Sequence, residues 1–212
     1  MSDLAKNKDK KPNLSTRTIV SCGMLAACAI ILTYLEFPTF IAPSFYRFNI
    51  SDLPALIGGF AMGPLAAIII ELIKSLVMLL INPSNPTLGI GELSNFILGC
   101  AFVVPASIIY RRKKTKKTAV IALIASGLFM ALLGAVLNAF VLIPMYASAY
   151  FNGSIESILD MGAAIFPFID SMFDFCLVCV LPFNLIKALV VSAITMFIYK
   201  PLSMLIKGIS NY

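Results

Sequence analysis

The chain has 212 residues, of which 60% are hydrophobic and only 12% are charged; its net charge is +6 and its mean hydropathy is +0.97. Soluble domains are about 45–50% apolar and about 25% charged, so the composition excludes a soluble protein. It predicts one helical membrane domain of about six spans, with no room for a soluble catalytic domain.

Several classes of site are also excluded. Histidine is absent, which removes the commonest acid–base residue and metal ligand. No GxxxxGK[ST] motif occurs, so the chain does not bind ATP through a P-loop of its own. The cysteines lie in apolar segments, have no second CxxC to complete a zinc site, and are expected to be packing residues. They are Cys22, Cys28, Cys100, Cys176 and Cys179.

In chain order, residues 1–16 form a charged stretch without a signal-peptidase site, so we expect a retained basic cytoplasmic tail. Clear apolar runs follow, and each approaches the roughly 20 residues that a membrane helix needs. They are 19–35, 64–81, 93–110, 119–143 and 181–199. Residues 53–81 are too long for one crossing and contain GGFAMGP. We therefore expect a short helix at about 53–62, a turn at Gly63-Pro64 and a full helix at 65–81.

The basic residues orient these spans. The tail and the cluster RRKKTKK (Arg111–Lys117) should both be cytoplasmic by the positive-inside rule. This predicts an all-α membrane protein with six transmembrane helices and both termini cytoplasmic. The membrane domain is 17–206, and 207–212 is a cytoplasmic C-terminus. The outer loops are then 36–52, 82–91 and 144–180, and the last is long and aromatic enough to be an ordered lid.

Polar residues inside membrane helices are functional candidates by default. Glu71 and Lys74 lie three residues apart, so they predict either an internal ion pair or a contact with a ligand or partner. Glu92 and Asn95 open the fourth span, where a carboxylate also complements the helix dipole. Asn138, near the outer end of the fifth span, is either an interhelical hydrogen-bonding residue or a ligand contact.

The segment LPFNLIKALVV (181–191) places Asn184 and Lys187 one turn apart on one side of the last helix. Lys187 could snorkel to the outer interface, but lysine is disfavoured at outer ends. We therefore expect a partner for it, with Asp170 or Asp174 as candidates. Together with Glu92, Asn95 and Asn138, these residues predict an outward-open ligand pocket beneath the two aromatic loops.

Four segments carry a family resemblance. FYRFNISDLPALIGGFAMGPLAAIIIELIKSLV (45–77) resembles the substrate-binding S components of energy-coupling factor (ECF) vitamin transporters. GIGELSNFILG (89–99), LNAFVLIPMY (137–146) and LPFNLIKALVV (181–191) are similar to the riboflavin-specific branch. The resemblance implies six helices and an outward-facing vitamin site capped by loops. It also implies a prokaryotic cell-membrane location, with a membrane coupling protein and two ATPase subunits as partners.

The resemblance also implies residue roles. Asn138, Asn184 and Lys187 match riboflavin contacts of the family, and Phe45, Tyr46 and Tyr146 could cover the flavin ring. Docking on the coupling protein uses small residues of the first helix. Here the pairs four apart are Gly23/Ala27 and Cys22/Ala26, which departs from a strict AxxxA. Neither a cofactor, nor nucleic acid, nor enzymatic activity of this chain is expected.

Three alternatives remain at this point. A sister S component for another vitamin, such as pantothenate, thiamine or folate, would share the architecture. A stand-alone secondary carrier would need a coupling-ion site, for which Glu71 and Lys74 are the intramembrane candidates. A membrane-embedded enzyme is the least favoured, since the sequence has no histidine and no nucleophile elbow.

Overall fold

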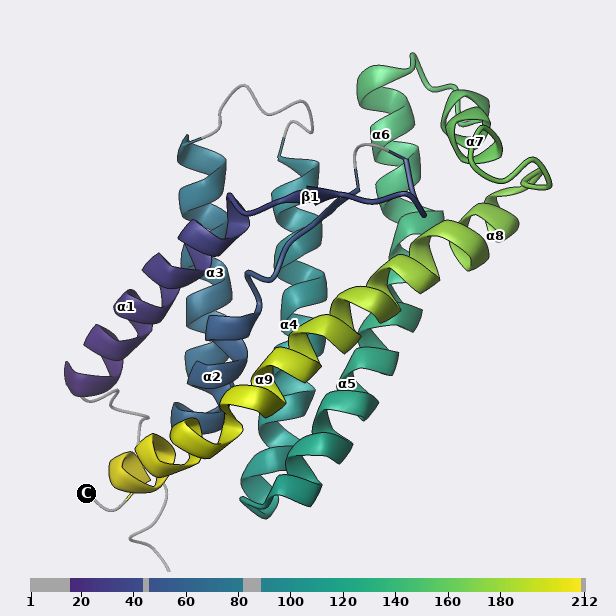
Figure 1. The fold of residues 1–212 in the computed structure, drawn as a ribbon. Coiled ribbons are helices and arrows are strands. Elements are labelled where there is room, and N and C mark those ends of the chain that lie inside the picture. The colour runs from purple at the N-terminus through teal and green to yellow at the C-terminus, as the bar shows by residue number, and fades with distance from the viewer. Residues whose placement is uncertain (1–15, 44–45, 82–88, 211–212) are drawn as a thin grey trace, which may run out of the picture.

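The computed structural model of the chain describes residues 16–43, 46–81 and 89–210. Phe45, the tail before residue 16 and most of the expected loop 82–91 lie outside the described residues. Helices make up most of the described chain (Figure 1). In chain order they are α1 (Thr16–Thr33), α2 (Leu53–Met62), α3 (Pro64–Ile81), α4 (Ile90–Arg112), α5 (Lys116–Leu137), α6 (Ile143–Tyr150), α7 (Glu156–Ala163), α8 (Met172–Phe175) and α9 (Leu181–Ser210).

Five segments are long and apolar enough to cross a membrane. They are Thr16–Thr33, Pro64–Ile81, Ile90–Arg112, Lys116–Tyr150 and Met172–Ile198. Helix α2 is apolar but shorter than these. The predicted interruption between α2 and α3 is confirmed, because α2 ends at Met62 and α3 begins at Pro64.

Gly63 makes this interruption possible. Its φ is +112°, a conformation that residues with a Cβ rarely adopt. A Cβ at this position would also collide with the guanidinium of Arg111. Arg111 Nη1 donates a hydrogen bond to the carbonyl of Met62 at 3.0 Å, so the last turn of α4 closes the end of α2.

Two helices run further than the sequence predicted. The expected fifth span, 119–143, continues through a π-helical turn, η1 (Asn138–Leu142), and α6 to Tyr150. The last span does not begin at 181, because α8 and a second π-helical turn, η2 (Cys176–Val180), lead directly into α9. The expected loop 144–180 is therefore reduced to residues 151–171, and this stretch contains α7.

Both expected span boundaries, at 143 and at 181, lie next to a proline. Pro144 and Pro182 each follow a π-helical turn by two residues. A proline ring clashes with the carbonyl four residues earlier, which normally ends an α-helix. Here the N–H groups of Ile143 and Leu181 bond five residues back, to the carbonyls of Asn138 and Cys176. The wider turn gives the proline ring room, so the helix continues.

The loop between α1 and α2 contains the antiparallel hairpin of β1 (Phe37–Pro38) and β2 (Arg47–Phe48). An exposed ion pair between Arg47 and Glu36, 3.3 Å apart, joins its ends. In Figure 1 this hairpin runs from the top of α1 toward α6. The chain therefore carries a short β element that the all-α prediction did not include.

The buried side chains form two clusters. The larger one joins α1, α2, α3, α4, α5 and α9, with Phe60 and Tyr110 stacked at its centre. The smaller one lies between the α1–α2 loop, α6, α7 and η2, and includes Ile143, Ile158 and Phe175. The polar residues described next lie on the elements that join these two clusters.

Candidate functional site

Asn138 and Asn184 are brought together by a glycine. Asn138 Nδ2 donates to the carbonyl of Gly134 at 2.8 Å, and a Cβ on Gly134 would lie only 2.8 Å from Asn184 Nδ2. The amide of Asn184 can therefore approach α5 because residue 134 has no side chain. Asn184 Nδ2 also donates to the carbonyl of Val180 at 3.0 Å, which fixes the orientation of its side chain.

The two π-helical turns supply this arrangement. Asn138 is the first residue of η1, and the carbonyl that holds Asn184 belongs to Val180, the last residue of η2. The two turns also contact each other. Single π-helical turns inside α-helices occur frequently at functional sites, and here each one carries an asparagine contact.

Tyr46, from the α1–α2 loop, packs beside Asn138. Its hydroxyl donates to Asn138 Oδ1 at 2.5 Å, and its ring lies 5.4 Å from that of Phe183. Burial raises the pKa of the Tyr46 phenol well above its ordinary value, so the hydroxyl stays protonated and remains a donor. The predicted residues Tyr46, Asn138 and Asn184 thus lie in one connected group.

Lys187 has a different partner from the predicted one. Its ammonium lies 2.9 Å from Asp52 Oδ2, so the candidates Asp170 and Asp174 were wrong. The side chain of Asp174 is instead bonded to Ser171 Oγ at 2.6 Å. Among the described residues, the ion pair with Asp52 is the one polar contact of the Lys187 ammonium. An ammonium group has three N–H donors, and Asp52 Oδ2 is the one charged contact of Lys187 within the described chain, so further N–H groups of Lys187 stay available.

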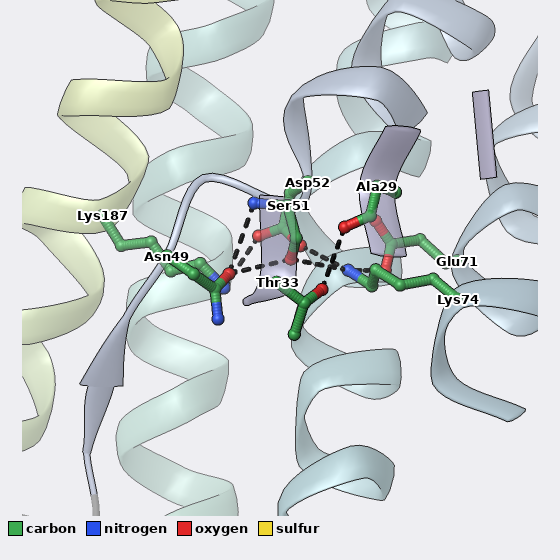
Figure 2. Close-up of polar contacts among 8 residues, drawn as sticks. All are labelled: Ala29, Thr33, Asn49, Ser51, Asp52, Glu71, Lys74 and Lys187. Carbon is green, nitrogen blue, oxygen red and sulfur yellow. Dashed lines mark hydrogen bonds and ion pairs between the residues drawn. The ribbon is translucent and has the colours of Figure 1, made fainter. Parts of the chain in front are cut away.

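Asp52 also binds a second lysine. Its other carboxylate oxygen, Oδ1, accepts a hydrogen bond from Lys74 Nζ at 2.8 Å. Lys74 in turn lies 2.6 Å from Glu71 Oε2 and donates to Ser51 Oγ at 3.3 Å. The predicted ion pair between Glu71 and Lys74 is thus confirmed, as part of a larger chain of charges (Figure 2).

This chain of charges is neutral and buried. It alternates as Glu71, Lys74, Asp52 and Lys187, with two carboxylates and two ammonium groups. The four residues come from α3, the start of α2, and α9, and all are at most 6% exposed. Burial alone would raise the pKa of Asp52, but the nearby Lys187 and Lys74 outweigh it and hold the pKa below its ordinary value. Asp52 is therefore a carboxylate.

The other predicted site residues are less closely linked. Glu92 is buried in the first turn of α4, and Tyr146 lies on α6. Tyr146 packs near Tyr150, with ring centroids 6.3 Å apart. Asn95 is half-buried on α4, and no hydrogen bond joins it to the group around Asn138 within the described residues. The predicted contact Phe45 lies outside the described residues.

The two small-residue pairs of α1 differ in exposure. Cys22 and Ala26 are buried in the main core, so they are not accessible to a partner. Gly23 and Ala27 are exposed, and a Cβ on Gly23 would meet no atom within 4 Å. Cys22, Cys176 and Cys179 are buried as packing residues, whereas Cys28 is exposed.

Comparison with known proteins identifies the family. A family model described as the substrate-specific component of ECF transporters matches residues 17–199. The chain is 31% identical to the riboflavin transporter RibU of Staphylococcus aureus (strain TCH60), over 96% of this chain and the whole of that protein. It is 27% identical to the riboflavin transporter FmnP of Bacillus subtilis (strain 168), over 88% of this chain and 92% of that protein.

The fold agrees with this similarity. A solved structure of the S component of a bacterial ECF transporter superposes with a TM-score of 0.69 and 29% sequence identity. The match covers 90% of this chain and 98% of that one. The chain therefore belongs to the substrate-specific components, or S components, of ECF transporters.

Proposed function

We propose that this S component binds riboflavin and delivers it inward with a separate ATP-driven module. The relatives named as riboflavin transporters match nearly the whole chain, including the segments that carry Asn138, Asn184 and Lys187. The binding site that we propose is the wall formed by these three residues, with Tyr46 beside it.

The observation that carries the proposal is that amide groups of this wall have donors and acceptors without a hydrogen bond inside the described chain. Asn138 and Asn184 each commit one amide N–H to a carbonyl of their own helix. Among the described residues, the second N–H of each amide and Oδ1 of Asn184 are left without a hydrogen bond. The pyrimidine-dione edge of riboflavin alternates carbonyl and N–H groups, so it needs both donors and acceptors. Lys187 adds donors only, which suits a carbonyl or the hydroxyls of the ribityl chain.

The aromatic residues complete the proposed site. Tyr46 and Tyr146 border the wall from the α1–α2 loop and from α6, and we propose that they cover the flavin ring together with Phe45. Each aromatic contact adds about 0.5–1.5 kcal/mol beyond the burial of its area. Glu92 and Asn95 extend the polar surface along the outer end of α4.

The topology and the partners belong to the same proposal. The helices cross the prokaryotic cell membrane with both termini in the cytoplasm, so the α1–α2 loop and α7 lie outside above the binding site. A membrane coupling protein and two ATPase subunits drive release inward. Gly23 and Ala27 form the docking face, because they are the exposed pair of small residues on α1.

A titration with purified protein tests the assignment. Riboflavin should bind in detergent with quenched flavin fluorescence, and the wild-type protein should be yellow when purified from riboflavin-containing medium. Pantothenate, thiamine and folate should not compete. Flavin fluorescence that stays unquenched at micromolar protein concentration would overturn the riboflavin assignment, and competition by another vitamin would identify a sister S component.

Uptake into vesicles tests the ATP-driven partner. Vesicles that contain this chain alone should bind riboflavin without accumulating it, and accumulation should require a coupling protein with ATPase subunits and ATP. Accumulation by the chain alone would favour a stand-alone carrier.

A further inference from the structure

Asp52 occupies a position that usually has another role. It is the residue that precedes α2, where an aspartate normally accepts a hydrogen bond from the first free N–H groups of the helix. Here its side chain makes no such bond. Both carboxylate oxygens instead contact lysines, with Oδ1 on Lys74 and Oδ2 on Lys187. The side chain is therefore committed to the two lysines and not to the helix.

One side of Asp52 is held by neighbours that are themselves fixed. Lys74 is held by three oxygens, from Asp52, Glu71 and Ser51. Ser51 Oγ also donates to Asn49 Oδ1 at 2.8 Å, and this ties the segment before α2 into a tight polar turn. These contacts fix the position of the Asp52 carboxylate independently of Lys187.

The other side of Asp52 faces the proposed binding wall. In Figure 2, Lys187 reaches the 51–52 segment from α9, while Lys74 reaches it from the opposite side. The side chain of Lys187 is 8% exposed and that of Lys74 is 3% exposed. Lys187 lies well inside the continuous span Met172–Ile198, so its buried charge needs a partner within the bundle.

We infer that Asp52 is a positioning residue of the riboflavin site, which holds the Lys187 ammonium on the wall beside Asn184 so that its free N–H groups face the ligand. This inference rests on the proposed function. Asp52 neutralises the charge of Lys187 through one carboxylate oxygen, which leaves further N–H donors of the ammonium for a ligand. The lysine can then donate to a neutral flavin within an apolar bundle. Lys74, Ser51 and Glu71 act one step further away, because they fix Asp52.

A double-mutant cycle tests the inference. The four proteins are wild type, Asp52→Asn, Lys187→Met and the double variant, and the readouts are the riboflavin Kd from fluorescence quenching and the melting temperature without ligand. Asp52→Asn should weaken binding by about tenfold or more, as expected for a lost interaction with a charged group. The double variant should bind no more weakly than Lys187→Met, because Asp52 then has nothing to position.

Two controls separate positioning from stability. Glu36→Gln removes one partner of the exposed ion pair with Arg47 in the same loop and should leave the Kd unchanged. Asp52→Glu keeps the charge but moves the carboxylate by one methylene, so its Kd should lie between those of wild type and Asp52→Asn. This variant also serves if Asp52→Asn does not fold.

The opposing results are clear. A purely structural Asp52 would lower the melting temperature while the folded fraction of both Asp52 variants binds riboflavin with the wild-type Kd. Fold-losses that multiply in the double variant would show that the two residues act independently. Either result overturns the inference.

Failure of the proposed function would look different. In that case wild-type protein would bind no riboflavin. The ligand-free melting temperatures of the same four proteins would then test the ion pair between Asp52 and Lys187. Non-additive melting shifts would support Asp52 as the residue that holds Lys187, and additive shifts would overturn it.

Discussion

The two buried lysines of the described helices differ in how many oxygen atoms contact them. Lys74, on α3, is held by three oxygens, from Asp52, Glu71 and Ser51. Lys187, on α9, has one ion-pair partner among the described residues, Asp52. Lys74 thus neutralises two carboxylates inside the bundle, whereas we propose that Lys187 keeps donors for a ligand. Asp52 is the residue that they share.

This difference gives a general way to interpret a charge inside a membrane helix. A buried ionisable group whose capacity is fully used by the protein supports folding, because removing it leaves other charges unpaired. A buried group that is neutralised but not saturated by hydrogen bonds is available for recognition. The two lysines should therefore separate stability from binding when each is changed.

The largest effect is expected for Lys74→Met. It removes the cation that contacts both Asp52 and Glu71, and leaves only Lys187 to balance their two carboxylates. Breaking a buried charge pair from one side costs about 3–5 kcal/mol, so thermal melting in detergent should show a severe loss of stability. The matched variant Lys74→Met with Glu71→Gln restores neutrality and should recover much of it. A melting temperature unchanged by Lys74→Met would contradict the role assigned to this lysine.

Lys187→Met should show the reverse pattern. Asp52 keeps its hydrogen bond to Lys74, so the melting temperature should change far less than in Lys74→Met. Riboflavin binding should weaken by about tenfold to a hundredfold, the range for losing hydrogen bonds from a charged donor. Lys113→Met, in the basic loop after α4, is the control and should bind normally. If Lys187→Met also binds normally, this lysine only balances the charge of Asp52.

A smaller effect on binding is expected for Gly134→Ala. The added methyl would lie 2.8 Å from Asn184 Nδ2, so the amide must turn away from α5. Alanine favours helix by about 1 kcal/mol relative to glycine, so stability should hold while the riboflavin Kd rises several-fold. Gly23→Ala is the matched control, because its methyl meets no atom within 4 Å. Equal Kd values for the two variants would show that the position of Asn184 does not matter.

Much of this architecture is predictable from local sequence. The spans follow from long apolar runs, and the break between α2 and α3 follows from Gly63 and Pro64. The spacing of Glu71 and Lys74 predicts their ion pair, which forms. Asn184 and Lys187 are conspicuous because polar groups are rare in apolar helices. These features depend on residues that are close together in the chain.

The remaining features depend on residues that are distant in the chain. The expected ends of two spans fall beside Pro144 and Pro182, but π-helical turns accommodate both prolines, and no local signal distinguishes a broken helix from a widened one. Asp52 has the appearance of an ordinary residue before a helix, so its pairing with Lys187 was missed. Its only signal was a carboxylate expected on the outer side, at a depth similar to that of Lys187. The packing of α2 against α9 brings the two together.

The smallest effect is expected for Tyr46→Phe, which tests how the α1–α2 loop supports the binding wall at Asn138. The change removes the hydroxyl that donates to Asn138 Oδ1 but keeps the ring against Phe183. The loss of one neutral hydrogen bond costs about 1 kcal/mol, so the riboflavin Kd should rise about fivefold. Tyr34→Phe, on an exposed tyrosine after α1, is the matched control and should leave the Kd unchanged. Because Asn138 would then have a free acceptor, a Tyr46→Phe protein that binds more tightly would show that the amide turns to the ligand once the tyrosine releases it. That result would make Tyr46 a competitor of the ligand and not a support of the wall.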